Sequence, residues 1–187
     1  MKHKVLCGLA AVLALPAFAE GPPQGVLLAA GVGATTVLGD GNLDGLEATL
    51  RLEASYRFGP HFQLGLHAVV GPDLAPPCYE NGCPVGYMVG GGLDGTFHFP
   101  LFRQADGYVG LTAGVFDVYR SLLAPQTNYA GPDVGGVAGV DWWQSKKVAL
   151  GGAIRASGGV FLDNYYGDQI NTTFFTIDVA FRLTYAL

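Results

Sequence analysis

Ser55, His61 and His98, with Glu53 as an acid, are the residues of this sequence whose types could form a hydrolytic site. In such a site a histidine takes a proton from the serine, and a carboxylate holds the histidine in its working orientation. A serine of this kind often sits in a G-x-S-x-G elbow, and the sequence contains no such elbow. The pattern therefore favours a serine and two histidines with structural roles, and no enzyme activity is predicted.

A second chemical possibility is a calcium site at residues 40–45, which read Asp-Gly-Asn-Leu-Asp-Gly. This matches the D-x-N-x-D-G opening of a calcium loop, in which oxygens of Asp40, Asn42 and Asp44 would surround the ion. The complete pattern requires a glutamate at its twelfth position, where this chain has Arg51. Asp, Asn and Gly also favour ordinary hairpin turns, so a turn is the prediction and calcium the alternative. No phosphate-binding G-x-x-x-x-G-K-[ST] motif occurs, and no cofactor is predicted.

The N-terminal residues 1–19 have the pattern of a secretory signal peptide. Two lysines supply a positive start, residues 5–15 an apolar core, and residues 17–19 an A-x-A cleavage site. We therefore expect one mature domain over residues 20–187. Loss of the two lysines changes the formal net charge from −5 to −7, which argues against nucleic acid as a partner.

Cys78 and Cys83 remain in the mature chain, within the segment C-Y-E-N-G-C of a proline-rich stretch. In an exported protein such a pair predicts a disulfide bond. Two thiolates without a nearby histidine would supply half of a zinc site at most, so metal binding is the less favoured interpretation.

The clearest structural signal is the alternation of apolar and polar residues from Leu46 to Phe58. Apolar side chains occupy every even position and polar ones every odd position, so one face of a β-strand is apolar and the other is charged. The segment is long for a soluble strand, but it suits a tilted membrane crossing of about 9–11 residues. Half of the chain is hydrophobic, yet no apolar stretch beyond the signal approaches the roughly 20 residues of a spanning helix. Because lipid tolerates no unpaired backbone, a closed barrel is the structure that remains.

Eight such segments predict an all-β fold, an eight-stranded antiparallel up-and-down transmembrane β-barrel. The segments are Gly25–Leu38, Leu46–Phe58, His61–Gly71, Val85–Phe99, Tyr108–Arg120, Val134–Trp143, Val148–Leu162 and Thr173–Leu187. In the fifth segment, the alternation of apolar residues places Asp117 on the face toward lipid. Either a bulge near Phe116 or the end of the membrane zone would account for this. The main alternative is a soluble lipocalin-like barrel, which has the same alternation of apolar and polar residues along its strands but carries the apolar side chains inside.

The connections divide into two sets by length and charge. One set holds the short turns Gly59–Pro60 and Gln144–Lys147 with the longer Pro100–Gly107, and the other holds Gly39–Gly45, Pro72–Pro84, Ser121–Asp133 and Asp163–Asn171. The second set contains seven acidic residues and no lysine or arginine, whereas the cations Arg103, Lys146 and Lys147 fall in the first. Outer-membrane barrels have short periplasmic turns and longer outer loops, so both chain ends are predicted to be periplasmic.

Aromatic residues gather near the predicted strand ends and are scarce between them. The set near the inner ends is Phe58, Phe62, Phe97, Phe99, Tyr108, Trp142, Trp143 and Tyr185, and the set near the outer ends is Phe116, Tyr119, Phe161, Phe174 and Phe175. Two aromatic girdles around an aliphatic band are typical of a membrane barrel. Such aromatic girdles are not expected in a soluble barrel.

With these features the chain resembles the small eight-stranded outer-membrane barrels of Gram-negative bacteria, the OmpA/OmpX-like family. Its last residues, F-T-I-D-V-A-F-R-L-T-Y-A-L, look like the assembly signal of that family, although the family usually ends in Phe and this chain ends in Leu187. The resemblance implies two partners: the lipid of the outer membrane, and the barrel assembly machinery acting through the C-terminal strand.

Charged residues are predicted to point into the barrel. They are Glu47, Arg51, Glu53, Arg57, Asp94, Asp141, Arg155, Asp178 and Arg182. An eight-stranded barrel is just wide enough for side chains to fill it, and a desolvated charge needs a partner, so we expect a salt-bridge network. The function favoured is a non-enzymatic structural or surface-interaction role with a filled lumen, and the alternative is a narrow channel for small solutes or ions. A lipid-modifying enzyme is the more remote reading, because Ser55, His61 and His98 fall at the end away from the outer leaflet.

Overall fold

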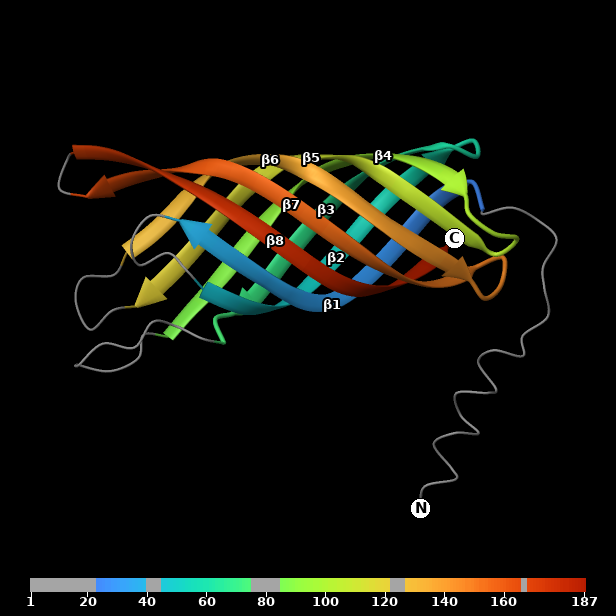
Figure 1. The fold of residues 1–187 in the computed structure, drawn as a ribbon, viewed down its shortest axis with the longest axis horizontal. Helices are drawn as coiled ribbons and strands as arrows, with labels where there is room; N and C mark the ends of the chain where they lie inside the picture. The colour runs from blue at the N-terminus through green and yellow to red at the C-terminus, as the bar shows by residue number, and fades with distance from the viewer. Residues whose placement is uncertain (1–22, 40–44, 75–84, 122–126, 166–167) are drawn as a thin grey trace, which may run out of the picture.

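The computed structural model describes residues 23–39, 45–74, 85–121, 127–165 and 168–187. Eight β-strands of this part of the chain form a closed antiparallel barrel, in which each strand pairs with its neighbours in sequence and β8 pairs with β1 (Figure 1). The strands are β1 (Gly25–Gly39), β2 (Gly45–Phe58), β3 (Phe62–Pro72), β4 (Val85–Pro100), β5 (Ala105–Ser121), β6 (Thr127–Trp143), β7 (Val148–Tyr165) and β8 (Asp168–Ala186). The predicted fold class is confirmed.

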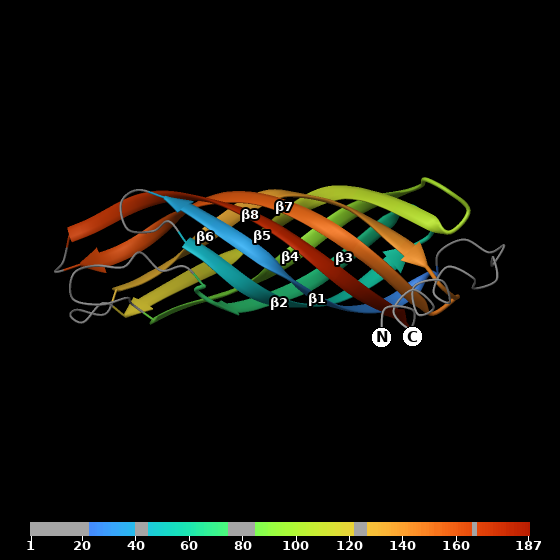
Figure 2. The same cartoon turned by 60° about the horizontal axis from the view of Figure 1, so that its bottom comes forward.

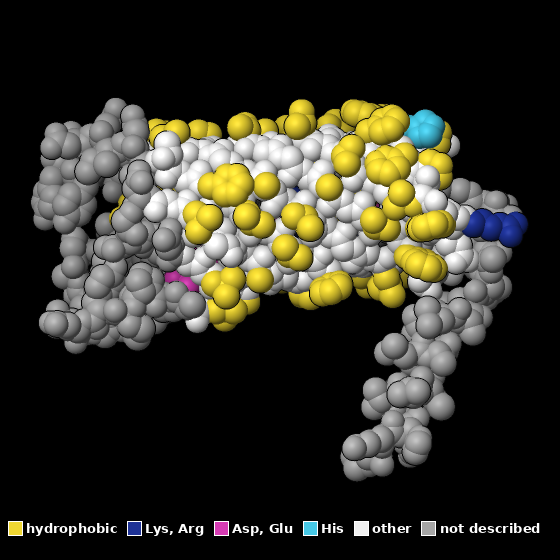
Figure 3. All heavy atoms as spheres, in the orientation of Figure 1, with side chains coloured by type: hydrophobic (Ala, Val, Ile, Leu, Met, Phe, Trp, Pro, Cys, Tyr) yellow, Lys and Arg dark blue, Asp and Glu magenta, His cyan; other side chains and the backbone are white. Residues whose placement is uncertain are grey.

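Apolar side chains cover the outer wall of the barrel. The even positions of β2 and the odd positions of β8 point outward, and Leu111 and Phe181 are 75% and 78% exposed. In Figure 3, hydrophobic side chains are spread over the visible wall, and the visible Lys and Arg side chains gather at one end. A soluble lipocalin-like barrel would turn these side chains inward, so that rival is excluded. No helix among the described residues is long and apolar enough to cross a membrane.

The two ends of the barrel differ in how the strands are joined. At one end, here called the turn end, residues 59–61, 101–104 and 144–147 join β2 to β3, β4 to β5 and β6 to β7. The C-terminus lies at this end, as Figures 1 and 2 both show. At the opposite end, here called the loop end, the strands are joined through residues outside the described ranges, except for the short stretches that border them.

Several strands extend further than the sequence predicted. The expected connection Ser121–Asp133 is largely strand, because β6 begins at Thr127, and β7 and β8 continue well into the expected connection Asp163–Asn171. Pro132 lies in this added part of β6, which pairs with β5 before the β6–β7 pairing begins at Asp133. A proline is tolerated at such an edge, where its missing N–H is not needed by a second strand. At the turn end, the expected connection Pro100–Gly107 shortens to residues 101–104.

The fifth strand contains no bulge. Its pairing with β4 runs without interruption from Pro100↔Asp106 to Val85↔Ser121, and its pairing with β6 is equally continuous. The side chain of Asp117 therefore points outward, and it is half-buried near the loop end. Of the two explanations for this residue, the bulge is wrong, and an end of the apolar zone at this level is the one left.

The aromatic residues do not all belong to girdles. Phe116, Phe161 and Phe174 at the loop end, with Tyr108 and Trp143 at the turn end, are buried inside the barrel. For these residues the girdle prediction was wrong, because proximity to a strand end does not specify which face a side chain takes. The outward aromatic side chains at the turn end include Phe58, Phe62, Phe97, Trp142 and Tyr185, and those at the loop end include Tyr87 and Phe175.

Candidate functional site

The interior of the barrel holds a chain of ion pairs at mid-height. Arg155 Nη2 lies 2.7 Å from Glu53 Oε1 and 3.1 Å from Asp94 Oδ2. Arg182 continues the chain, with Nη1 3.2 Å from Glu53 Oε2 and Nε 3.4 Å from Asp141 Oδ1. These side chains are almost fully buried, so each charge depends on its partner for stabilisation.

The ion pairs of Arg155 cross the lumen. Arg155 lies on β7, Glu53 on β2 and Asp94 on β4, and neither β2 nor β4 is adjacent to β7 in the barrel. A hydrogen-bonded contact between non-adjacent strands has to pass through the interior. The central chain therefore occupies the lumen instead of lining it.

His67 also contacts the central chain of ion pairs, through Asp94. Its Nδ1 lies 3.1 Å from Asp94 Oδ2, the same oxygen that faces Arg155. His67 was not among the predicted lumen residues, although its odd position in a strand with Leu64 and Leu66 outward was enough to point it inward.

A second cluster lies toward the turn end. Asp106 Oδ2 accepts a hydrogen bond from Arg57 Nη1 at 2.6 Å and lies 2.8 Å from His98 Nδ1. His98 Nε2 lies 3.0 Å from Thr96 Oγ1, and Arg57 also donates to the carbonyl of Pro60 in the adjoining turn. Sequence reasoning missed Asp106, because it placed this residue in a connection over residues 100–107, which the structure shortens to residues 101–104.

Tyr108 connects the turn-end cluster to the central chain. Its hydroxyl accepts a hydrogen bond from Arg182 Nη1 at 2.9 Å, and its ring lies 5.2 Å from the guanidinium carbon. The ring of His98 lies 5.2 Å away on the other side. Gly139 makes room for this tyrosine, since a Cβ at that position would collide with the phenol.

A third cluster lies toward the loop end. Asp178 Oδ2 pairs with Arg51 Nη2 at 3.0 Å, and its Oδ1 accepts hydrogen bonds from Thr35 at 3.0 Å and Thr49 at 3.4 Å. Glu47, opposite Thr35 in the β1–β2 pairing, is 1% exposed. All of the predicted lumen charges therefore lie inside the barrel, and they form separate clusters along its axis.

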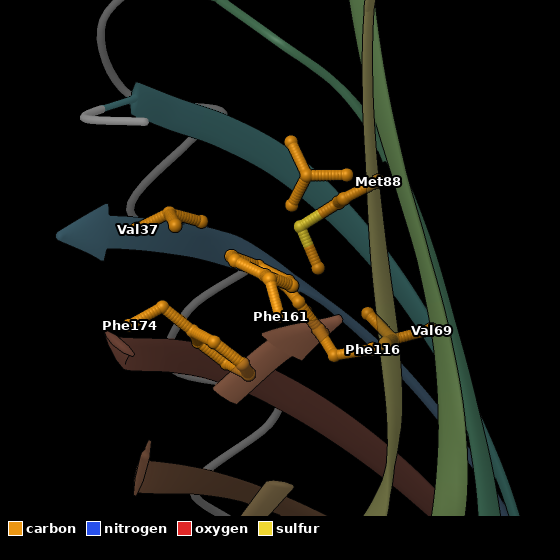
Figure 4. Close-up of a cluster of buried hydrophobic side chains, with 7 residues drawn as sticks. Val37, Val69, Met88, Phe116, Phe161 and Phe174 are labelled. Atoms are coloured by element: carbon orange, nitrogen blue, oxygen red, sulfur yellow. The ribbon is translucent and has the colours of Figure 1, made fainter. Parts of the chain in front are cut away.

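An apolar cluster closes the interior beyond the charges at the loop end. We call it the apolar cap, and it consists of Val37, Val69, Met88, Phe116, Val118, Phe161 and Phe174. The rings of Phe161 and Phe174 stack with centroids 4.0 Å apart, and Phe116 lies 5.6 Å from Phe174 (Figure 4). The sequence analysis did not predict this cap, because it assigned the three phenylalanines to an outer girdle.

Two small cavities lie in the described part of the interior. One, of about 10 Å³, lies by Glu53, Ser55 and His98, and another, of about 30 Å³, lies between Arg51, Arg155 and the cap. A water molecule needs about 10–15 Å³ of such space. These cavities are of the size of one or a few water molecules, and a chain of ion pairs lies between them.

The possible hydrolytic residues are not brought together as a triad. Ser55 Oγ accepts a hydrogen bond from Gln63 Nε2 at 2.9 Å, and His98 is engaged by Asp106 and Thr96. His61 lies on the outside of the barrel, stacked on the ring of Phe97. Ser55 and His61 therefore face opposite sides of the wall, and Glu53 is held by two arginines.

Two predicted sites lie outside the described residues. The calcium candidate Asp40, Asn42 and Asp44 and the cysteine pair Cys78 and Cys83 fall in residues 40–44 and 75–84. Within the described ranges, no group of three or more His, Cys, Asp or Glu side chains is arranged to hold a metal ion.

Solved structures with the same fold are outer-membrane proteins. Neisserial surface protein A superposes with a TM-score of 0.70 at 13% identity, over 90% of this chain and all of that one. The outer membrane protein OprG of Pseudomonas aeruginosa gives 0.56 at 12% identity over 89% and 99%, and the outer membrane protein AlkL in lipid bilayers gives 0.50 at 14% over 92% and 95%. No protein-family model matches the sequence, and no curated protein matches it.

The fold and its neighbours define the class of this protein: it is a small eight-stranded β-barrel of the outer-membrane type. Its apolar outer wall is accordingly the surface that meets lipid. Among the described residues, its interior holds three charged clusters and an apolar cap.

Proposed function

We propose that this chain is a non-enzymatic outer-membrane barrel whose lumen is closed and whose role is structural or that of a surface for interaction at the loop end. The observation that supports this most directly is the pair of contacts from Arg155 to Glu53 and Asp94, which cross the lumen between non-adjacent strands. An ion that entered the barrel would have to break these buried pairs. It would also have to displace the stacked rings of the apolar cap.

Conductance in a planar bilayer tests the closed lumen. The refolded protein should show no discrete openings under an applied voltage. A matched variant, Arg155→Gly with Phe161→Ala, removes one side chain from the ion-pair chain and one from the cap, and it should conduct if it folds. Steady openings of the unmodified protein would support the alternative, a narrow channel for small solutes or ions, and would overturn the closed lumen.

We infer that the turn end faces the periplasm. The exposed cations Arg103, Lys146 and Lys147 lie there with three short turns, whereas the sequence places acidic residues in the connections at the loop end. Short turns on the periplasmic side are usual for this class. Both ends of the mature chain would then be periplasmic. The C-terminal strand β8, with outward Phe181, Leu183 and Tyr185, would be accessible to the barrel assembly machinery during insertion.

Export through a signal peptide is part of the same proposal. Cleavage after Ala19 would leave Glu20 as the first residue. Mass spectrometry of the protein purified from outer membranes should give the mass of residues 20–187, less two hydrogens if Cys78 and Cys83 form the proposed disulfide. The mass of residues 1–187 would contradict cleavage.

A lipid-modifying activity is tested separately. Overexpression should leave the mass spectrum of lipid A unchanged, because Ser55 and His61 lie on opposite faces of the wall and His98 is tied to Asp106. A new lipid A species that disappears in a Ser55→Ala variant would overturn the non-enzymatic assignment.

A further inference from the structure

The cavity of about 30 Å³ lies where the charged interior meets the apolar cap. Arg51 and Arg155 line it from one side, and Met88 and Phe116 of the cap line it from the other. The two arginine residues are 7% and 6% exposed, so their guanidinium groups face this space without help from bulk water.

Both guanidinium groups have unused hydrogen-bond donors. Arg51 uses Nη2 for Asp178, and Arg155 uses Nη2 for both Glu53 and Asp94. Nε and Nη1 of each arginine are buried and have no hydrogen-bond partner among the described residues. A buried donor that stays unpaired is unfavourable, because it has lost its hydrogen bond to water without replacement.

Two like charges face the same small space. Arg51 and Arg155 lie close enough to repel one another, and Asp178, Glu53 and Asp94 offset part of this repulsion. The hydroxyls of Ser157 and Thr176, which also line the cavity, share one hydrogen bond of 2.8 Å. Since only one of the two hydroxyls donates in that bond, the other retains a hydrogen that can point elsewhere.

Of the two acidic side chains among the described residues that line this cavity, Asp178 is already engaged by three donors. Asp178 accepts from Arg51, Thr35 and Thr49, and Asp133 lines the cavity from near the start of the β6–β7 pairing. His67 also lines the cavity, with its Nδ1 on Asp94. The free hydrogen-bonding capacity between the two arginines is therefore that of donors, which suits an acceptor with negative charge.

We propose that this cavity binds one small monovalent anion between Arg51 and Arg155, held by their Nε and Nη1 groups. The anion would reduce the repulsion between the guanidinium groups and satisfy their free donors. The cavity is a few water molecules in size, which accommodates an ion as small as chloride or bromide. This site depends neither on the orientation of the barrel nor on whether the lumen conducts.

Bromide locates the site directly. Crystals of the refolded protein grown in sodium bromide should give an anomalous difference peak between Arg51 and Arg155, within hydrogen-bond distance of their Nε atoms. Electron density without an anomalous signal would mean that water alone fills the cavity, and would overturn the proposal. This measurement uses the unmodified chain, so it stands even if a variant fails to fold.

The stability of the protein in detergent solution provides a second test. In detergent, the denaturation midpoint should be higher in sodium chloride than in sodium gluconate at equal ionic strength, and the difference should saturate as chloride replaces gluconate. Arg51→Lys keeps the charge beside Asp178 but removes the free donors, so it should lose most of this difference. The matched control Arg57→Lys, beside Asp106 and away from the cavity, should keep it. An equal loss in both variants, or no difference in the unmodified protein, would show that chloride acts without this site.

A milder variant addresses the hydroxyl pair. Ser157→Ala should raise the half-saturating chloride concentration only slightly and should not abolish the effect, because Thr176 keeps a hydroxyl hydrogen that can point into the cavity and both arginines remain. Thr184→Val, which removes a buried hydroxyl bonded to Arg182 outside the cavity, should leave the chloride response unchanged. A larger loss of the response in Thr184→Val than in Ser157→Ala would contradict this assignment.

Discussion

At the scale of single residues, the interior is organised around arginines that each hold more than one acid. Arg155 holds Glu53 and Asp94, and Arg182 holds Glu53 and Asp141. Such an arrangement is sensitive to the loss of one member, because an acid left without its partner is a buried, uncompensated charge.

Replacing Arg155 by methionine is therefore expected to destabilise the barrel by about 3–5 kcal/mol, the usual cost of breaking a buried ion pair by removing one partner. Urea unfolding of the protein in lipid vesicles measures this change. Asp94→Asn combined with Glu53→Gln in the same chain should recover part of the loss, since the acids are then neutral. Arg103→Met, at an exposed turn, serves as the control and should have little effect.

The apolar cap makes a second prediction at this scale. Phe161 is fully buried in the aromatic stack, whereas Phe181 lies on the outer wall and is 78% exposed. Phe161→Ala should cost about 3–5 kcal/mol in the same unfolding assay, because it leaves a cavity in a packed cluster. Phe181→Ala should cost clearly less. Equal losses would mean that Phe161 does not pack as the structure shows.

At the scale of the strands, glycines on the inner face decide which large side chains the barrel can hold. A Cβ at Gly139 would collide with the ring of Tyr108, whereas a Cβ at Gly95 on the outer face would meet nothing within 4 Å. The strand therefore uses glycine at position 139 to admit a tyrosine from the neighbouring strand β5, opposite across their pairing.

Gly139→Ala should accordingly destabilise the protein by about 1–3 kcal/mol, the range for added volume in a packed interior, and Gly95→Ala should be nearly neutral. The shift of the denaturation midpoint with heat in detergent gives the comparison. Measuring Gly139→Ala in a Tyr108→Ala chain tests the cause, because the ring is then absent and the glycine substitution should cost less, with the carbonyl oxygen of Gly152 still crowding the new methyl group.

The strands also show where sequence reasoning works and where it fails. Alternation in β2 and β8 gave their faces correctly, because a period of two is a local property of an extended chain. The same local reasoning began β6 too late, at Val134, and placed Asp106 in a turn, since whether a residue such as Pro132 or Asp106 belongs to a strand depends on the partner strand at that level.

At the scale of the whole molecule, the two ends of the barrel carry different chemistry. The turn end exposes Arg103, Lys146 and Lys147 beside short turns, whereas the sequence places acidic residues in the connections at the loop end. This asymmetry is the basis for placing the turn end in the periplasm.

Cysteine labelling on intact cells tests that placement. In a chain with Cys78 and Cys83 replaced by serine, Leu74→Cys at the exposed loop end should react with a membrane-impermeant maleimide. Arg103→Cys at the turn end should react only after the outer membrane is opened. The reverse pattern would require the opposite orientation.

The residue pattern alone indicates a membrane-spanning barrel and correctly turns the nine charges named in the sequence analysis inward, because both follow from the alternation along single strands and from the absence of a long apolar stretch. The folded barrel is needed to show which charges meet, that Arg155 spans the lumen, that His67 and Asp106 join the clusters, and that three phenylalanines form a cap inside the barrel. These contacts join residues on strands far apart in the sequence. Their geometry is set by the closure and register of the barrel, which no single strand contains.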